Sequence, residues 1–247
     1  MSLCRDTLLD LPERSFRQVF RMNKLSFHHL VGKIENHPVF HNNSRNPQRD
    51  VWIQILVALE RLGCQGNGAS VGRIARSNGI GDGTVVLYTN RVMLAVLSIE
   101  NEYIRLDNVL ERQQTSLRMN TKYGFFGCVG VADGTHIILN QKPHTDGETY
   151  FSRKGSYSLN CQLVCDDRKL IKYYQIGWPG SVYDNQCFEE TFLYTEPDRF
   201  LSPGDYLLGD SAYRLTNRMC IPYRHPQAEV PHNKLFNELF STLTLEL

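Results

Sequence analysis

Apolar residues in the first 120 positions recur at helical spacing. One predicted helix begins after a cap at Ser26 and places four apolar residues at i, i+3, i+4 and i+7: Phe27, Leu30, Val31 and Ile34. Segment 51–62 is apolar on most sides, and Gly63 follows it. We expect it to form a helix at the centre of a bundle, capped by Asp50 and ended by Gly63. The front of the chain is therefore predicted to be helical.

Residues 70–98 have the spacing of a helix-turn-helix. A small residue, Ala75, is followed by a glycine four positions later and by a β-branched residue six positions after that, which lets two helices cross closely. The turn is expected at 78–81, and the second helix near Thr84. Its polar residues would face a DNA groove or its phosphates, with the candidates Thr84, Asn90 and Arg91. An ordinary helical hairpin has the same pattern, so both interpretations stay open.

From Tyr123 the periodicity changes to that of strands. Residues 107–122 are polar and are predicted to form a connecting helix or linker. We then expect three antiparallel strands, a helix near Asn185, a fourth strand and a C-terminal helix. The strands are expected at residues 128–140, 157–165, 170–176 and just before Asp210. This is the order of an α/β domain and differs from that of a helical bundle.

Two of the predicted strands each present one aspartate. Asp133 lies inside the apolar, β-branched run CVGVADGTHIILN, and Asp210 ends the apolar part of YLLGDSAY. An ionised carboxylate in such a run is costly unless it is paired or holds a metal ion. The alternative role for each is to cap a turn at the end of a strand. His136 falls on the other face of its strand, and we expect it to be a hydrogen-bonded structural residue.

Composition and charge add limited information. The seven cysteines are odd in number and lie mostly in apolar runs, which favours buried, reduced thiols. Residues 1–120 hold 15 Lys/Arg and 11 Asp/Glu (+4), whereas residues 121–247 hold 12 and 15 (−3). This asymmetry fits a DNA-contacting part joined to a cation-binding part. No apolar run of about 18 residues and no signal peptide is present, so we expect a soluble, intracellular protein without membrane contact.

Several motifs occur together in a specific order. GVADGTH, YFSRKGSYSLNCQLVCD, GWPGSVYD, LLGDSAY and LFNELFS resemble the DDE nuclease domain of PIF/Harbinger transposases and of proteins derived from them. The resemblance covers about residues 123–241, and the helical front is similar to the N-terminal part of that family. It implies an α/β (α+β) fold: a ribonuclease H-like mixed sheet with flanking helices, preceded by an all-helical N-terminal region with a helix-turn-helix at about 70–98. The domains are accordingly expected at 1–122 and 123–247.

The resemblance implies a metal-dependent DNA endonuclease or transposase of the DDE type. Cutting a phosphodiester needs an activated water and stabilised charge, which two divalent ions can supply, and carboxylate oxygens suit Mg²⁺ or Mn²⁺. Asp133 is expected to bridge both ions, and Asp210 to bind one. Arg153 and Lys154 either hold DNA phosphates or are simply solvated. For Asp184 we favour a helix N-cap over a carboxylate near the metals.

The third acid departs from the family pattern. The resemblance places a glutamate seven residues after the position of Ser241, with an arginine between them, but Thr244 stands at the arginine position and the chain ends at Leu247. Glu246, 36 positions after Asp210, is the substitute that this sequence offers as catalytic residue and metal ligand. The nuclease domain is therefore expected to be truncated at its C-terminus.

A second class of function stays open because of this missing acid. The chain would then be a transposase-derived DNA-binding or protein-interaction factor that has lost cleavage. In both cases the expected partner is DNA and the expected location is the nucleus, with the cytoplasm as the alternative. The resemblance also implies a Myb-like partner protein, and a homodimer stays open.

Overall fold

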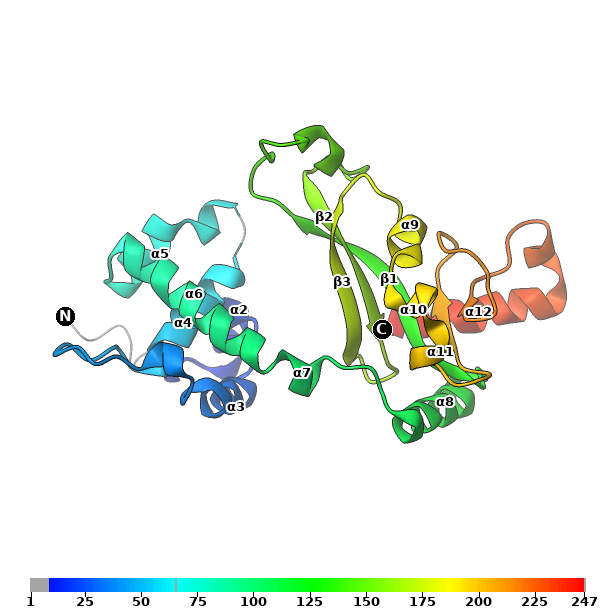
Figure 1. The fold of residues 1–247 in the computed structure, drawn as a ribbon, viewed down its shortest axis with the longest axis horizontal. Coiled ribbons are helices and arrows are strands. Elements are labelled where there is room, and N and C mark those ends of the chain that lie inside the picture. The colour runs from blue at the N-terminus through cyan, green and yellow to red at the C-terminus, as the bar shows by residue number, and fades with distance from the viewer. Residues whose placement is uncertain (1–8, 65, 247) are drawn as a thin grey trace. The chain divides into compact units, whose positions relative to one another are not determined.

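The chain divides into two compact units, Met1–Glu100 and Asn101–Leu247. The structure is a computed structural model that describes residues 9–64 and 66–246, and the side chains of Leu245 and Glu246 lie outside this description. Figure 1 shows a helical first unit and a second unit built on a sheet. The fold class is thus mixed α/β with a helical N-terminal region, as predicted.

Helices alone make up the described part of the first unit. Its elements are α2 (Glu13–Phe20), α3 (Lys24–Ile34), η1 (Pro38–Phe40), α4 (Val51–Leu62), η2 (Gly66–Ala69), α5 (Val71–Asn78) and α6 (Asp82–Ser98). The bounds of α4 and its end at Gly63 agree with the prediction. The predicted cap of α3 is wrong, because the side chain of Asn23 accepts the hydrogen bond from the Ser26 backbone N–H. The true cap lies three residues earlier than expected and starts the helix with Lys24.

Helix α4 holds the first unit together. One core cluster joins it to α2, α3 and α6 through residues such as Phe16, Phe27 and Leu56. A second cluster joins it to α5 and α6 through Val57 and Ile74. A helix that packs on several sides needs apolar residues around most of its circumference, which explains the composition of segment 51–62.

The helix-turn-helix segment has the predicted elements. Helix α5 ends at Gly79, which adopts a left-handed conformation (φ 61°), and α6 begins three residues later. A left-handed helix end costs glycine little, so the glycine in this turn is explained by backbone geometry. Ala75 and Val85 are both buried in the same cluster, as the close-crossing pattern requires.

A five-stranded mixed sheet forms the centre of the second unit. Its strands are β1 (Cys128–Ile138), β2 (Ser158–Cys165), β3 (Ile171–Pro179), β4 (Tyr206–Gly209) and β5 (Met219–Cys220). The spatial order is β3-β2-β1-β4-β5, with β2 antiparallel to β1 and β3, and β4 parallel to β1 and β5. This is the expected ribonuclease H-like arrangement. The two-residue strand β5 was not predicted, because so short a strand has no detectable period.

Helices cover both faces of this sheet. The helices of this part of the chain are α7 (Glu100–Tyr103) at the unit boundary, away from the sheet, then α8 (Val109–Tyr123), α9 (Asp184–Glu189), α10 (Phe192–Thr195), α11 (Pro197–Phe200) and α12 (Pro231–Glu246), with the short turns η3 (Gly147–Tyr150) and η4 (Gln227–Glu229). Helices α8 and α12 pack with Val131 and Leu208. Helices α9 and α10 pack with Ala132 and Leu207 in the other cluster. Adjacent residues of β1 and β4 therefore face opposite cores, as strand geometry requires.

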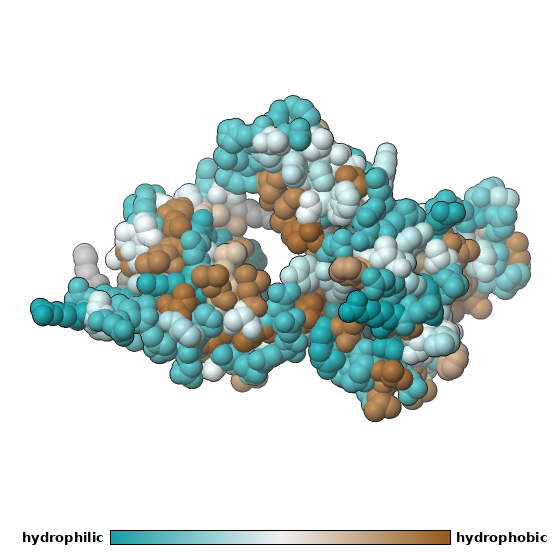
Figure 2. Space-filling model, viewed as in Figure 1, coloured by the Kyte–Doolittle hydropathy of each residue, from teal (hydrophilic) through white to brown (hydrophobic). Residues whose placement is uncertain are grey.

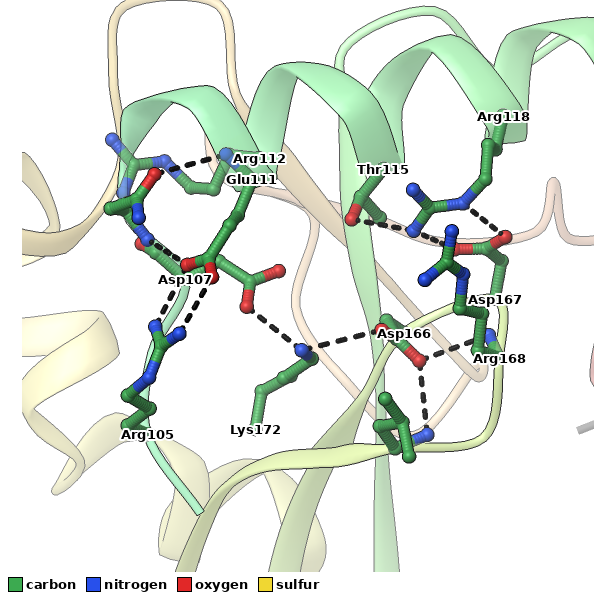
Figure 3. Close-up of polar contacts among 12 residues, drawn as sticks. Arg105, Asp107, Glu111, Arg112, Thr115, Arg118, Asp166, Asp167, Arg168 and Lys172 are labelled. Atoms are coloured by element: carbon green, nitrogen blue, oxygen red, sulfur yellow. Dashed lines mark hydrogen bonds and ion pairs between the residues drawn. The ribbon is translucent and has the colours of Figure 1, made fainter. Parts of the chain in front are cut away.

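The boundary between the units differs from the predicted one at 122/123. Helix α8 belongs with the sheet, because its residues Met119 and Tyr123 are buried against β1. Its polar composition suggested a linker, but the polar residues make specific contacts. The ammonium group of Lys172 on β3 lies 2.9 Å from a carboxylate oxygen of Asp107 and 3.4 Å from one of Asp166. Figure 3 shows Lys172 between these two carboxylates.

A second ion pair fixes α8 to the turn between β2 and β3. Arg118 donates two hydrogen bonds of 2.7 Å to the carboxylate of Asp167 (Figure 3). In the same turn, one carboxylate oxygen of buried Asp166 accepts hydrogen bonds of 2.9 Å from the backbone N–H groups of Arg168 and Leu170. Bidentate and charge-assisted bonds of this kind are the strong ones, so the turn, α8 and the segment before it form one unit.

Burial also explains why most cysteines lie in apolar runs of the sequence. Cys128, Cys161 and Cys187 are buried free thiols, and burial raises the pKa of Cys128 to about 12. This confirms the interpretation as buried, reduced thiols for these three cysteines. Cys64, Cys165 and Cys220 are free thiols that are only half-buried, and Cys4 lies outside the described residues. Among the described helices, none combines the length and the apolar character needed to cross a membrane.

We predict that Asp166→Asn destabilises the chain by about 2 kcal/mol, because it weakens two backbone hydrogen bonds and an ion pair at a buried position. Urea denaturation followed by circular dichroism measures the change. The matched control is Glu196→Gln, which removes an exposed i,i+3 pair with Arg199 and should change stability by less than about 0.5 kcal/mol. Equal effects of the two substitutions would contradict the role given to Asp166.

Candidate active site

Strand pairing brings Asp133 and Asp210 side by side. In the parallel pair of β1 and β4, Ala132 lies opposite Gly209, so the next residue on each chain is one of the two aspartates. Neighbouring strands lie about 4.8 Å apart. Both aspartates follow, by two positions, residues that pack with α8 and α12, so their carboxylates project on that face of the sheet. Both side chains are exposed.

The environment of Asp133 disfavours its charge. Burial of part of the side chain raises the pKa of this carboxyl, and the carboxylates of Asp210 and Asp184 raise it further. A hydrogen bond of 2.9 Å from the Gly134 N–H and the positive charge of Lys154 act in the opposite direction. Repulsion among neighbouring carboxylates is the condition that a divalent cation relieves.

Asp210 also caps the turn at the end of its strand, which is the alternative role that the sequence left open for it. Its Oδ1 atom accepts a hydrogen bond of 2.9 Å from the backbone N–H of Ala212, which closes the turn after β4. The backbone N–H of Tyr213 donates to the Asp210 carbonyl at 3.2 Å. The turn therefore orients the carboxylate, and the structural role is compatible with a chemical one.

Asp184 is not the predicted helix cap. Tyr183 occupies the N-cap of α9 and makes no side-chain capping hydrogen bond, and Asp184 is the first residue of the helix. Its Oδ1 atom accepts hydrogen bonds from Asn160 (2.8 Å) and Gln162 (3.3 Å) on β2. This carboxylate lies against Gly134, where an added Cβ would be 2.1 Å from Oδ1. The glycine of the DGTH motif therefore admits a third acid on the face of β1 opposite to Asp133, close enough for its charge to raise the pKa of Asp133.

Buried polar residues of β2 support this third acid. The Tyr213 hydroxyl donates to the side-chain carbonyl of Gln162 at 2.6 Å, and the Gln162 amide donates to Asn160 at 2.8 Å. Burial raises the pKa of Tyr213, so it stays a neutral donor. Sequence reasoning missed this network. The detectable signal was the alternation of Asn160 and Gln162 in the otherwise apolar run YSLNCQLVC.

The structure places the other predicted residues of the second unit in different environments. Lys154 is exposed and close enough for its charge to lower the pKa of Asp133. Arg153 is exposed as well. His136 shares a 3.0 Å hydrogen bond with the Ser158 hydroxyl, which confirms its structural role. Glu246 is the last residue of α12, but its side chain lies outside the described residues.

The described part of the chain contains no group of three or more His, Cys, Asp or Glu side chains arranged to hold a metal ion. Asp133 and Asp210 have the placement and the chemistry of metal ligands, because they present two exposed carboxylates on adjacent strands. Hard oxygen donors of this kind suit Mg²⁺ or Mn²⁺. The expected role of Glu246 as the third ligand stays a prediction.

The predicted DNA-contacting residues of the first unit all lie on α6. Asn90 is exposed, while Thr84 and Arg91 are half-buried. Around Asn90 the outer face of α6 is apolar, and its exposed residues are Val86, Leu87, Met93, Leu94 and Leu97. Figure 2 shows brown, hydrophobic surface over this part of the first unit. A DNA-reading face is normally polar and basic, so this face suits an apolar contact better.

Comparison with known proteins agrees with this geometry. Residues 132–245 match the family model described as DDE superfamily endonuclease. Residues 132–245 of the second unit therefore carry a DDE superfamily endonuclease domain. Endonucleases of this superfamily generally use divalent metal ions. The resemblance inferred from the motifs is confirmed.

Individual relatives extend the similarity into the helical front. The chain is 27% identical over 219 residues to the Mus musculus protein named "Putative nuclease HARBI1" and 25% identical over 219 residues to its Homo sapiens counterpart, each covering 87% of this chain. It is 22% identical over 249 residues to the "Protein ALP1-like" of Arabidopsis thaliana, covering 94%. The chain spans about 60% of the length of these relatives. No solved structure matches it significantly.

We predict that metal-free Asp133→Asn is more stable than the natural chain at pH 7. The raised pKa means that ionising this carboxyl costs more in the folded than in the unfolded chain, so the penalty is absent at low pH and grows as pH rises through the raised pKa. Discounted for exposure, the gain should be about 0.5 kcal/mol at pH 7 and should vanish near pH 3. Urea denaturation in EDTA at several pH values measures it.

A matched control for this titration is Asp146→Asn, at an exposed left-handed turn position that asparagine also tolerates. Its stability difference should stay small at every pH. A gain from Asp133→Asn that is the same at pH 3 and pH 7 would contradict the electrostatic explanation.

Proposed function

We propose that this chain is a metal-dependent DNA endonuclease of the DDE type. The observation that supports it most directly is the register of β1 and β4, which sets Asp133 and Asp210 side by side on one face of the sheet. The match of residues 132–245 to the DDE superfamily supports the class of reaction. DNA as the substrate implies work in the nucleus.

In this proposal Asp133 and Asp210 hold the divalent ions, Mg²⁺ or Mn²⁺. Bound in a pair, such ions supply an activated water and stabilise charge on the attacking and leaving oxygens of the phosphodiester. The pKa of Asp133 is raised by burial and by the like charges of Asp210 and Asp184, and these like charges favour cation binding at the site. Glu246 is the proposed third ligand.

The other residues near the acids orient the site. The turn after β4 holds the Asp210 carboxylate through the Ala212 N–H. The amides of Asn160 and Gln162 hold Asp184 close enough to Asp133 for its charge to add to the attraction for cations. Lys154 places a positive charge within range of the acids, where it can attract the DNA backbone.

A nicking assay tests the proposal. Supercoiled DNA carrying candidate element ends is incubated with the full chain and Mg²⁺ or Mn²⁺. We expect cutting that requires the metal and falls at least 100-fold in Asp133→Asn and in Asp210→Asn, because each substitution removes a ligand charge. Asp146→Asn, which changes the same charge away from the site, should cut like the natural chain.

The absence of cutting with every divalent metal, in a chain that still binds DNA, would sink the endonuclease proposal. Cutting that persists in both aspartate variants would contradict the assignment of Asp133 and Asp210 as the catalytic site.

The second candidate is a transposase-derived DNA-binding or protein-interaction factor. The apolar outer face of α6 favours it, because two of its residues, Leu94 and Leu97, are 58% and 55% exposed. Exposed apolar residues gathered on one helix face are typical of a surface that contacts another protein. A Myb-like protein or a second copy of the chain is the proposed partner.

DNA contact by α6 has its own test. If Arg91 contacts a phosphate, Arg91→Ala should weaken duplex binding and reduce the slope of log affinity against log salt by about 0.9. Fluorescence anisotropy at several salt concentrations measures both values. Arg17→Ala removes the same charge from α2 and is the control. Unchanged affinity and slope in Arg91→Ala would contradict DNA contact by α6 and would favour contact of α6 with another protein.

A further inference from the structure

A cavity of about 570 Å³ opens beside Asp210 in the second unit. Its wall begins at Ala212, two residues after the aspartate, and includes Asn185 at the start of α9 and the segment 220–224 that follows β5. A hydrogen bond of 2.8 Å from the Arg214 backbone N–H to the Asn185 side chain ties the first two walls together. The volume falls in the range of pockets that enclose a small organic molecule.

Positive charge lines this cavity. Arg214 and Arg224 both contribute to the wall, and no aspartate or glutamate does. The Arg214 side chain is exposed and makes no hydrogen bond or ion pair with the described residues. Arg224 donates to the carbonyl of Ser211, the residue directly after Asp210. Guanidinium groups bind phosphate oxygens with matching geometry, so the charge of the cavity complements an anionic, phosphate-containing ligand.

An aromatic ring stands exposed in the same wall. Tyr223 is 46% exposed, and its neighbour in the cavity, Leu215, is 63% exposed. The Tyr223 ring packs edge-to-face on Phe236 at 5.4 Å, and two hydrogen bonds of 2.9 Å with the Asn237 side chain hold its backbone. The ring is therefore held in place while part of its surface stays open. Nucleotide bases stack on aromatic rings presented in this way.

We propose that this cavity receives one unpaired nucleotide of the DNA strand that adjoins the bond to be cut. Arg214 and Arg224 hold its phosphate, and Tyr223 stacks on its base. The inference rests on the proposed function and adds to it a preference for DNA with an unpaired nucleotide. DNA with an unpaired nucleotide next to the cutting site should bind better than fully paired DNA, because a paired base is not free to leave its stack.

Binding to two DNA duplexes tests the subsite without cutting. The duplexes differ in one unpaired nucleotide beside the candidate cutting site, and affinities are measured by anisotropy in EDTA with the full chain. We expect the unpaired form to bind about 5- to 10-fold more tightly, within the range for base stacking on an aromatic ring. Arg214→Gln and Tyr223→Leu should each abolish the preference.

Matched variants separate the subsite from folding and from general charge. Tyr223→Phe keeps the ring, and Arg214→Lys keeps the charge, so each should retain most of the preference. Arg199→Gln removes an exposed arginine outside the cavity and should leave the preference intact. Circular dichroism and thermal melting of every variant check the fold.

A photochemical readout locates the base. Placing 5-iodouracil at the unpaired position and irradiating the complex should crosslink the DNA to Tyr223, as identified by mass spectrometry, and Tyr223→Leu should remove that crosslink. Equal affinity for both duplexes, or a crosslink only outside the cavity, would overturn the subsite.

The results also distinguish this inference from the proposed function. Metal-dependent nicking without any preference for the unpaired form would overturn the subsite and leave the endonuclease standing. A preference that depends on Tyr223 in a chain that never nicks DNA would leave the subsite standing and overturn the endonuclease. A chain that binds neither duplex would overturn both.

Discussion

The parallel pairing of β1 with β4 is the constraint on which the candidate site depends. These strands are separated in sequence by two further strands and three helices, yet their register places Ala132 opposite Gly209 and therefore one aspartate beside the other. Parallel neighbours need a long crossover between them, and here that crossover also delivers α9 and its first residue, Asp184. The pairing and its crossover thus bring three carboxylates within electrostatic range of one another, and partial burial together with the charges of Asp210 and Asp184 raises the pKa of Asp133.

The network that supports the acids is made of neutral groups, and this has a physical reason. Asn160, Gln162 and Tyr213 are buried, and hydrogen bonds connect Tyr213 to Gln162, Gln162 to Asn160, and Asn160 to Asp184. Neutral donors orient a carboxylate without cancelling its charge, so the edge of the sheet stays attractive to cations. Basic side chains also lie near the acids, namely Lys154, whose charge reaches Asp133, and the arginines of the cavity beside Asp210. Such an arrangement suits a substrate with an anionic backbone.

The two units present different kinds of surface. The sheet unit combines exposed carboxylates with a basic, partly aromatic cavity, which are the features of a site for chemistry on a nucleic acid. The first unit has an apolar outer face on α6, where the helix-turn-helix pattern alone predicted polar contacts to DNA. Binding of a protein by the first unit and of DNA by the second would combine the two candidate functions in one chain.

The sequence by itself determined the class of fold, the family and the two aspartates, because strand period, motif order and an acid within an apolar run are all local signals. It also located α4 and the turn between α5 and α6. Tertiary structure decided what depends on neighbours distant in sequence. It made α8 part of the sheet unit through the ion pair between Arg118 and Asp167, and it turned Asp184 from a helix cap into an acid beside Gly134. A residue's partner across the sheet follows from strand register, which local periodicity does not encode.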